Sequence, residues 1–309
     1  MKLYIKWFYG YRNFGDEMLF FGLLNYLQRE YNPESFTVEV WDLQRIQTRI
    51  QHNKTWLEPW ILDKLDFVEN AVISRRFRQL QIFLWLDKYR KYFKVFGWWE
   101  VLDESRKFPH DWWNLKILYR HDIRKKNFIL VWWIGTDQKK YTKKLFKYMF
   151  KKTKRVICRE KTSYERAVQY WAKSAVLYQD FSKDILEDFK NKNPVSLSST
   201  VLINISPKHF TDDNIEKIKK FVLKYPDHKK IFFPADINFD KEFYSVLRKV
   251  IPDLVVYDWT KHSLLDTLKL FQSCDAGIGS RLHFLYPLKV FEKEFVSLSS
   301  SDKVSKFIK

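Results

Sequence analysis

The sequence predicts an α/β protein built from two Rossmann-like, doubly wound domains that face each other across a cleft. Short runs of β-branched and aromatic residues alternate with amphipathic helical segments, a pattern typical of parallel sheets covered by helices. One polar, proline-containing stretch, residues 191–199, interrupts the alternation and is predicted to be a linker. The length of 309 residues leaves room for about two ordinary domains. We therefore expect an N-terminal domain over residues 1–190 and a C-terminal domain over residues 200–309.

The N-terminal domain is expected to open with a strand, a turn and a helix. Residues 2–8 alternate and branch like a strand, residues 10–15 suit a turn, and the acidic pair at 16–17 begins an amphipathic helix. Acidic residues in the first turn of a helix interact favourably with its dipole. Thr162 or Ser163 is expected to cap a later helix. Further strands are predicted over residues 36–41, 91–96, 127–131, 155–158 and 175–178, and largely helical structure over residues 56–90.

The C-terminal domain is expected to repeat this alternation, without an internal sequence repeat of fixed period. Strands are predicted over residues 201–205, 230–233, 254–257, 274–278 and 295–298. Helices are predicted over residues 212–224, 240–249, 263–272 and 302–308.

Residues 277–283 (GIGSRLH) join the last well-defined strand to a helix. Such a strand, turn and helix start is where open α/β sheets bind ligands. The helix N-terminus offers unpaired N–H groups to an anion, Arg281 offers a planar fork, and His283 titrates near neutral pH. Together they suit an anionic substrate that needs a proton, although an arginine and a histidine at a helix start are also common as plain surface residues.

Composition excludes several classes of protein. A hydrophobic content of 46% indicates a globular chain. Apolar runs end well before the roughly 18 residues of a membrane span, and the first residues lack the long apolar core of a signal peptide, so a cytoplasmic location is expected. Cys158 and Cys274 are too few and too far apart for a disulfide framework or a metal site. We expect both thiols to be small core residues.

The net charge of +19 favours an anionic partner, which could be nucleic acid, an acidic membrane surface or anionic metabolites. The sharpest basic cluster is residues 139–155. We expect a helix with a solvated basic face there, and contact with the inner face of the membrane is the alternative. A nucleic-acid-binding protein would gather charge and aromatic residues on one face. Here the aromatic residues fall mostly in strands and apolar helix faces, so no specific nucleic acid is expected.

Five short motifs occur in an order that resembles the polysaccharide pyruvyl transferase family. They are residues 10–17 (GYRNFGDE), residues 155–159 (RVICR) with Ser163, the pair Gln179 and Asp180, residues 279–283 (GSRLH), and residues 302–304 (DKV). The resemblance covers nearly the whole chain. It implies a GT-B-like architecture and transfer of a pyruvyl group from phosphoenolpyruvate to a sugar of a cell-surface polysaccharide or its precursor, as a ketal. It implies no metal and no organic cofactor.

Phosphoenolpyruvate carries a carboxylate and a phosphate, so Arg159 and Arg281, from opposite domains, could clamp it bidentately. Ketal formation needs a proton at C3 of the enol, for which His283 is the natural catalytic acid, and its neutral form could accept a proton from a sugar hydroxyl. The acceptor is expected to be a sugar or a lipid-linked saccharide. The remaining residues expected to bind substrate are Asn13, Gly15, Asp16, Ser163 and Lys303.

Three other interpretations stay open. A GT-B glycosyltransferase would use a nucleotide sugar, and it would want an acidic residue for the ribose near the C-terminal cleft, for which the sequence offers no clear candidate. A basic nucleic-acid-binding protein is the alternative from another class. An inactive family member kept as a scaffold is the last.

The glycine and tryptophan counts are unusual. The chain has only 7 Gly but 13 Trp, whereas ordinary usage of about 7% predicts roughly 22 glycines at this length. Doublets at 98–99 and 132–133, and Trp171, stand where the family has glycine-rich turns. A tryptophan adopts a positive φ poorly. We hypothesise that these residues are glycines encoded by UGA in a lineage that reads UGA as glycine, whereas Trp41 and Trp259, in strand-like surroundings, are expected to be genuine. The alternative is an aromatic-rich natural protein.

Overall fold

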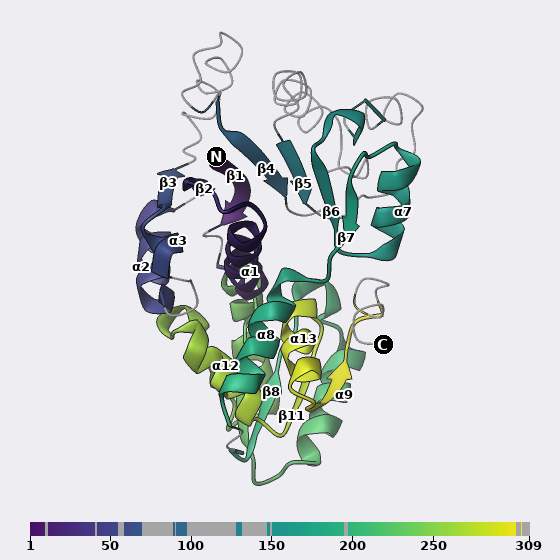
Figure 1. Ribbon diagram of the computed structural model, residues 1–309. Helices are drawn as coiled ribbons and strands as arrows, with labels where there is room; N and C mark the ends of the chain where they lie inside the picture. Colours follow the sequence, from purple (N-terminus) through teal and green to yellow (C-terminus); the bar gives the residue numbers. More distant parts are fainter. Residues whose placement is uncertain are drawn as a thin grey trace. The chain divides into compact units, whose positions relative to one another are not determined.

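The computed structural model is organised around two parallel β-sheets, each flanked by helices (Figure 1). It describes residues 1–9, 12–40, 42–54, 59–69, 89, 91–97, 128–131, 147–148, 150–194, 197–300 and 304.

The first sheet has seven strands among the described residues, in the order β3-β2-β1-β4-β5-β6-β7. All its neighbouring strands are parallel, and Ile5 of β1 aligns with Val38 of β2 and Val95 of β4. This order reverses between β1 and β4, as in Rossmann folds. The strands are β1 (Lys2–Tyr9), β2 (Ser35–Val40), β3 (Leu65–Glu69), β4 (Phe93–Gly97), β5 (Phe128–Val131), β6 (Arg155–Cys158) and β7 (Ala175–Leu177). The helices from this part of the chain are α1 (Phe14–Tyr31), α2 (Leu43–Asn53), α3 (Pro59–Leu62) and α7 (Lys161–Gln169).

The second sheet has five parallel strands in the order β10-β9-β8-β11-β12, which is the same winding. Its order reverses between β8 and β11. The strands are β8 (Thr200–Ile203), β9 (Lys229–Phe232), β10 (Val255–Val256), β11 (Ala276–Gly279) and β12 (Glu294–Ser297). The α-helices are α8 (Phe181–Lys192), α9 (Asp212–Leu223), α10 (Ile237–Asp240), α11 (Tyr244–Val250), α12 (Leu264–Ser273) and α13 (Leu282–Val290). Short 3₁₀ turns are η2 (Pro207–His209), η3 (Lys241–Phe243) and η4 (Trp259–Lys261).

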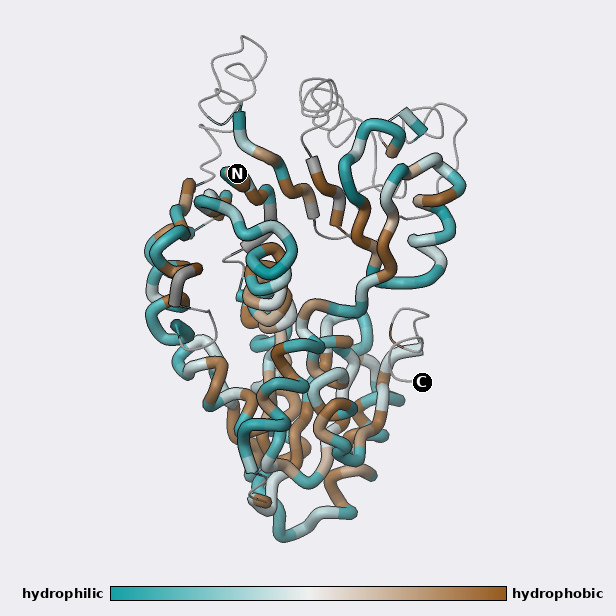
Figure 2. Tube along the Cα trace, in the orientation of Figure 1, coloured by the Kyte–Doolittle hydropathy of each residue, from teal (hydrophilic) through white to brown (hydrophobic). Residues whose placement is uncertain are grey.

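Hydrophobic burial follows this layering. Strands of a parallel sheet are covered on both faces and therefore read as continuous apolar runs. Val201, Leu202 and Ile203 of β8 are each fully buried. Leu247 of α11 and Phe221 of α9 close over the same core. Figure 2 shows hydrophobic colour along β6 and β7 of the first sheet, with α7 largely hydrophilic.

The chain packs as two compact units that are not contiguous in sequence. The first holds Met1–Gly10, Leu24–Ile46 and Glu58–Asp180, and the second holds Tyr11–Leu23, Gln47–Leu57 and Phe181–Lys309. The chain was expected to divide at residues 191–199, whereas α8 packs with the second unit. A β-carbon at Gly22 would lie 2.1 Å from the carbonyl oxygen of Phe181, the first residue of α8. The absence of a side chain at Gly22 therefore lets α1 and α8 meet closely.

Most predicted elements are present, with two corrections. Residues 65–69, expected to be helical with their surroundings, form β3, an edge strand paired with β2. A five-residue run shows too little periodicity to separate strand from helix. The N-cap of α7 is Glu160, not Thr162 or Ser163, and both hydroxyls donate instead to the Glu160 carboxylate. The predicted tail helix lies outside the described residues except for Val304, which is buried.

Trp171 has a left-handed backbone at the end of α7. Its φ is 64°, and its N–H donates to the Val168 carbonyl at 2.9 Å, while the Ala172 N–H donates to the Ala167 carbonyl at 3.0 Å. These two bonds form a Schellman motif, in which the left-handed position is usually glycine. The expected positive φ is thus confirmed at Trp171. Trp41, Trp98, Trp99, Trp132 and Trp133 lie outside the described residues.

Replacing Trp171 with glycine should stabilise the protein. Its side chain is 60% exposed and contacts Lys147 at 5.0 Å from the ring centroid, so little burial is lost. A left-handed L-residue costs about 1–2 kcal/mol, which suggests a gain of roughly 1 kcal/mol in the free energy of unfolding. Urea unfolding of Trp171→Gly measures this gain.

Trp259→Gly is the matched control. Trp259 is 1% exposed and its Nε1 donates to the Pro234 carbonyl at 2.9 Å. Its loss should destabilise the protein by at least about 3 kcal/mol. Lower stability of Trp171→Gly, or a UGG codon at position 171, would contradict the glycine hypothesis at that position.

Candidate functional site

The carboxyl ends of β8, β9 and β11 bring three turns of the second unit together. The turn after β8 contains Asn204, the turn after β9 leads through Asp236 to Asp240, and the turn after β11 contains Arg281. Because β8 and β11 are neighbours where the strand order reverses, this edge is the topological switch point of the sheet. Ligands of doubly wound sheets bind at such points.

Arg281 is held there by a buried carboxylate. Its Nε lies 3.2 Å from each carboxylate oxygen of Asp240, and its Nη2 also donates to Asp240. Asp240 is fully buried, whereas the Arg281 side chain is 26% exposed. Burial raises the pKa of the Asp240 carboxyl, and the Arg281 guanidinium opposes that shift. One edge of the guanidinium is thus fixed, and Nη1 has no hydrogen bond within the part of the chain that the structure describes.

Asn204 ties the three turns into one framework. Its Oδ1 accepts the backbone N–H of Arg281 at 3.1 Å. Its Nδ2 donates to the Phe233 carbonyl at 2.9 Å and to Asp240 Oδ2 at 3.3 Å. Asp240 Oδ2 also accepts the N–H of Asp236 at 3.0 Å. These partners were not predicted from the sequence; the available signal was a polar residue directly after a buried strand.

The amino end of α1 is hydrogen-bonded to the turn after β9. Asn13 caps the helix, its Oδ1 accepting the N–H of Asp16 at 3.3 Å. Its Nδ2 donates to Asp236 Oδ2 at 3.3 Å. The Phe14 N–H donates to the Ala235 carbonyl at 2.8 Å. Asn13 and the buried Asp16 therefore belong to the second unit, beside the Arg281 framework.

His283 packs against Gly15 of this helix. A β-carbon at position 15 would lie 2.2 Å from Nδ1 of His283, so only glycine permits the contact. His283 lies in the first turn of α13, two residues after Arg281. The structure thus brings five of the predicted site residues, Asn13, Gly15, Asp16, Arg281 and His283, to the same edge of the second sheet.

Arg159 belongs to the first unit. Its Nη1 lies 3.2 Å from Asp180 Oδ2, and the two side chains are 4% and 1% exposed. Two motifs that were noted separately, RVICR and the Gln179–Asp180 pair, are therefore joined by an ion pair. Ser163 is fully buried and donates to Glu160 at 3.1 Å. Because Arg159 and Arg281 lie in different units, their predicted clamp stays a prediction, and Lys303 lies outside the described residues.

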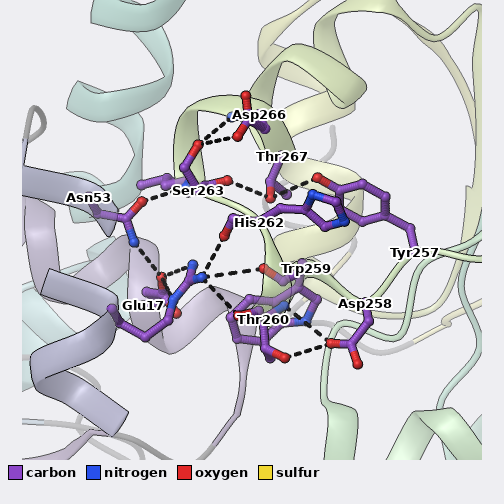
Figure 3. A network of polar contacts seen from close by, with 12 residues as sticks. Glu17, Asn53, Tyr257, Asp258, Trp259, Thr260, His262, Ser263, Asp266 and Thr267 are labelled. Carbon is purple, nitrogen blue, oxygen red and sulfur yellow. Dashed lines mark hydrogen bonds and ion pairs between the residues drawn. The ribbon is translucent and has the colours of Figure 1, made fainter. Parts of the chain in front are cut away.

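Glu17, the acidic residue after Asp16, is engaged in a buried network of the second unit (Figure 3). Its carboxylate accepts from Arg49 and from Asn53 Nδ2, the latter at 3.1 Å. Arg49 also donates to the carbonyls of Trp259, Thr260 and His262. These bonds fasten α1 and α2 to the segment after β10, so Glu17 has a structural role.

The two cysteines lie in the core. Cys158 and Cys274 are buried free thiols, as expected, and burial raises the pKa of each to about 12. Among the described residues, no group of three or more His, Cys, Asp or Glu side chains is placed to hold a metal ion. No helix in the described part of the chain is both long and apolar enough to span a membrane.

The sequence profile of polysaccharide pyruvyl transferases matches residues 13–286, which include all three framework turns and the start of α1. The chain belongs to the polysaccharide pyruvyl transferase family. The expected family is thus confirmed. Among curated proteins, no significant match is found.

Solved structures similar to this transferase include three UDP-GlcNAc 2-epimerases. The Neisseria meningitidis enzyme, bound to UDP-GlcNAc, has a TM-score of 0.60 at 9% identity, over 100% of this chain and 85% of its own. The Rickettsia bellii enzyme has a TM-score of 0.59 at 10% identity, over 97% of this chain and 79% of its own. The Methanocaldococcus jannaschii enzyme has a TM-score of 0.57 at 9% identity, over 99% of this chain and 86% of its own. At such identities the likeness shows the fold alone, and it confirms the expected GT-B-like α/β class.

Asp240→Asn should lower the free energy of unfolding of the transferase by about 1–3 kcal/mol, because it leaves the half-buried guanidinium of Arg281 without its charged partner. Urea unfolding measures the loss. Asp213→Asn is the matched control, since Asp213 pairs with Lys217 in an exposed position, 75% and 53% accessible, and its loss should be clearly smaller. Equal losses in the two variants would contradict a special role for the Asp240 pair.

Gly15→Ala should displace the His283 ring while leaving α1 intact, because the new methyl group would overlap Nδ1. The ring resonances of His283 in NMR spectra should shift. Gly22→Ala is the control: its methyl group would meet the Phe181 carbonyl and destabilise the fold by roughly 1–3 kcal/mol, with little change at His283. Unshifted His283 resonances in Gly15→Ala would show that the contact is not made.

Proposed function

We propose that this transferase moves a pyruvyl group from phosphoenolpyruvate to a sugar of a cell-surface polysaccharide or its precursor, forming a ketal and releasing phosphate. The observation that carries the proposal is the Arg281 fork, fixed by a buried carboxylate at the switch point, with His283 two residues further on. Family membership supports the reaction type.

Each residue has a task that the chemistry requires. One sugar hydroxyl adds to C2 of the enol while C3 takes up a proton; a second hydroxyl then displaces phosphate from C2. Of the two hydroxyl protons, one ends on C3 and the other leaves with phosphate. His283 is proposed to deliver the proton to C3 and, when neutral, to accept one from the sugar. Arg281 is proposed to bind and orient the donor anion, together with Arg159 of the first unit.

Support for the acceptor site comes from the amino end of α1. Asn13 and Gly15 lie beside His283, so a sugar hydroxyl held there would be near the proposed acid and base. Asp16, Ser163 and Lys303 remain proposed substrate contacts. The reaction balances with its two substrates, so the proposal includes no cofactor. A lipid-linked acceptor would place the enzyme at the inner face of the membrane, where the basic residues 139–155 would favour anionic lipid.

The test is phosphate release from phosphoenolpyruvate in the presence of saccharides that present neighbouring hydroxyl pairs. His283→Ala should lower kcat by about 10²–10⁴-fold with little change in donor affinity, because general acid catalysis acts in the transition state. Arg281→Lys should mainly weaken donor binding, since an ammonium cannot replace the fork.

Two controls sharpen this assay. His228→Ala removes a histidine that pairs with Asp275 at 3.1 Å, where β9 and β11 begin, and should leave turnover unchanged. A UDP-sugar offered as the donor tests the glycosyltransferase alternative. Unchanged turnover in His283→Ala would remove His283 from the mechanism, and turnover only with the UDP-sugar would replace the proposed reaction.

A further inference from the structure

A second histidine lies at the same sheet edge as Arg281, and the mechanism above leaves it unused. His209 ends the 3₁₀ turn η2 that follows β8, at the same sheet edge as the framework of Asn204. Arg281 is near enough to lower the pKa of His209, so the two side chains share one electrostatic environment. This residue was not predicted from the sequence.

A chain of hydrogen bonds fixes the ring of His209. Ser280 Oγ accepts the N–H of Ser206 at 2.9 Å and donates to Ser206 Oγ at 3.1 Å. Ser206 Oγ also lies 2.9 Å from Nδ1 of His209, and its hydroxyl can donate to that nitrogen. A neutral imidazole that accepts at Nδ1 carries its proton on Nε2. Both serines are buried, so this orientation is built into the fold.

The backbone of His209 is fixed as well. Its carbonyl accepts from Nδ2 of the buried Asn214 at 2.8 Å. The next residue, Phe210, stacks on Phe243 with ring centroids 4.3 Å apart. Nε2, in contrast, has no hydrogen-bond partner among the residues that the structure describes. The molecule therefore presents an N–H donor at the same sheet edge as Arg281.

The surroundings of His209 favour its neutral form. Burial lowers its pKa, and the cations Lys208, on the same turn, and Arg281, from the turn after β11, lower it further. The Asp240 carboxylate pairs with Arg281. From the packed helix α9, the contact that reaches His209 is the uncharged Asn214 amide. Two cations and an uncharged N–H donor in one place suit a ligand with several anionic oxygens better than a single carboxylate.

We propose that His209 binds phosphate through its Nε2–H, next to Arg281, and so forms the phosphate subsite of the donor. This assignment rests on the proposed function for the identity of the donor. In this arrangement the arginines bind the carboxylate of phosphoenolpyruvate, and His283 delivers the proton to C3.

The experiment compares binding of inorganic phosphate, phosphoenolpyruvate and pyruvate to the full chain by calorimetry. His209→Ala should weaken binding of inorganic phosphate roughly 10- to 100-fold, as expected for a lost hydrogen bond to a charged group, and should leave pyruvate affinity nearly unchanged. His209→Gln keeps an uncharged donor near Nε2 and should retain affinity within a few-fold. His228→Ala is the matched histidine control and should not differ from the wild type.

An NMR titration of the wild-type histidine rings gives a readout that would not change if His209 had only a structural role. Added inorganic phosphate should raise the pKa of His209, because the dianion favours the imidazolium, and should leave the ring resonances of His228 unshifted. An unmoved His209 pKa, or phosphate affinity that survives in His209→Ala, would overturn the subsite even if turnover with phosphoenolpyruvate is found. Phosphate binding that depends on His209, without release of phosphate from phosphoenolpyruvate, would support the subsite and overturn the proposed reaction.

Discussion

The candidate site depends on one interaction, the pairing of the fully buried Asp240 with Arg281. A buried carboxylate is costly unless it is both paired and hydrogen-bonded. Asp240 meets both conditions, through the guanidinium, the Asn204 amide and the N–H of Asp236. Because these partners come from the turns after β8, β9 and β11, satisfying the charge also fixes the turns. The site is thus rigid because the buried charge of Asp240 must be paired and hydrogen-bonded.

The same framework reaches the first helix of the chain. Asp236 accepts from Asn13, which caps α1, and α1 in turn supplies the glycine against which His283 packs. His283 therefore takes its position from a contact far away in sequence as well as from its own helix. The proposed acid and the proposed anion ligand are held by different contacts, which is why their substitutions should separate kcat from donor binding.

The sequence predicted the elements of the fold well and the site in part. The switch-point turn with Arg281 and His283 was readable because a glycine-containing strand end followed by a helix start is a local pattern. Asp240 was not, since its role appears only when β9 and β11 lie in one sheet with β8 between them. His209 was missed for the same reason: its serine partners come from two different turns. The strand β3 was missed because its five residues carry too short a pattern.

The second unit is assembled from pieces that are made at different times. Phe14 packs its ring 5.1 Å from that of Phe233 and 5.7 Å from that of Phe271, and Asn53 accepts the N–H of Leu264. During translation, residues 11–23 and 47–57 leave the ribosome long before the sheet that receives them exists. Their apolar surfaces therefore stay without their packing partners until the whole first unit has been synthesised. The nascent chain therefore cannot finish one unit before starting the other, and the beginning of α1 should be a natural point of contact for a chaperone.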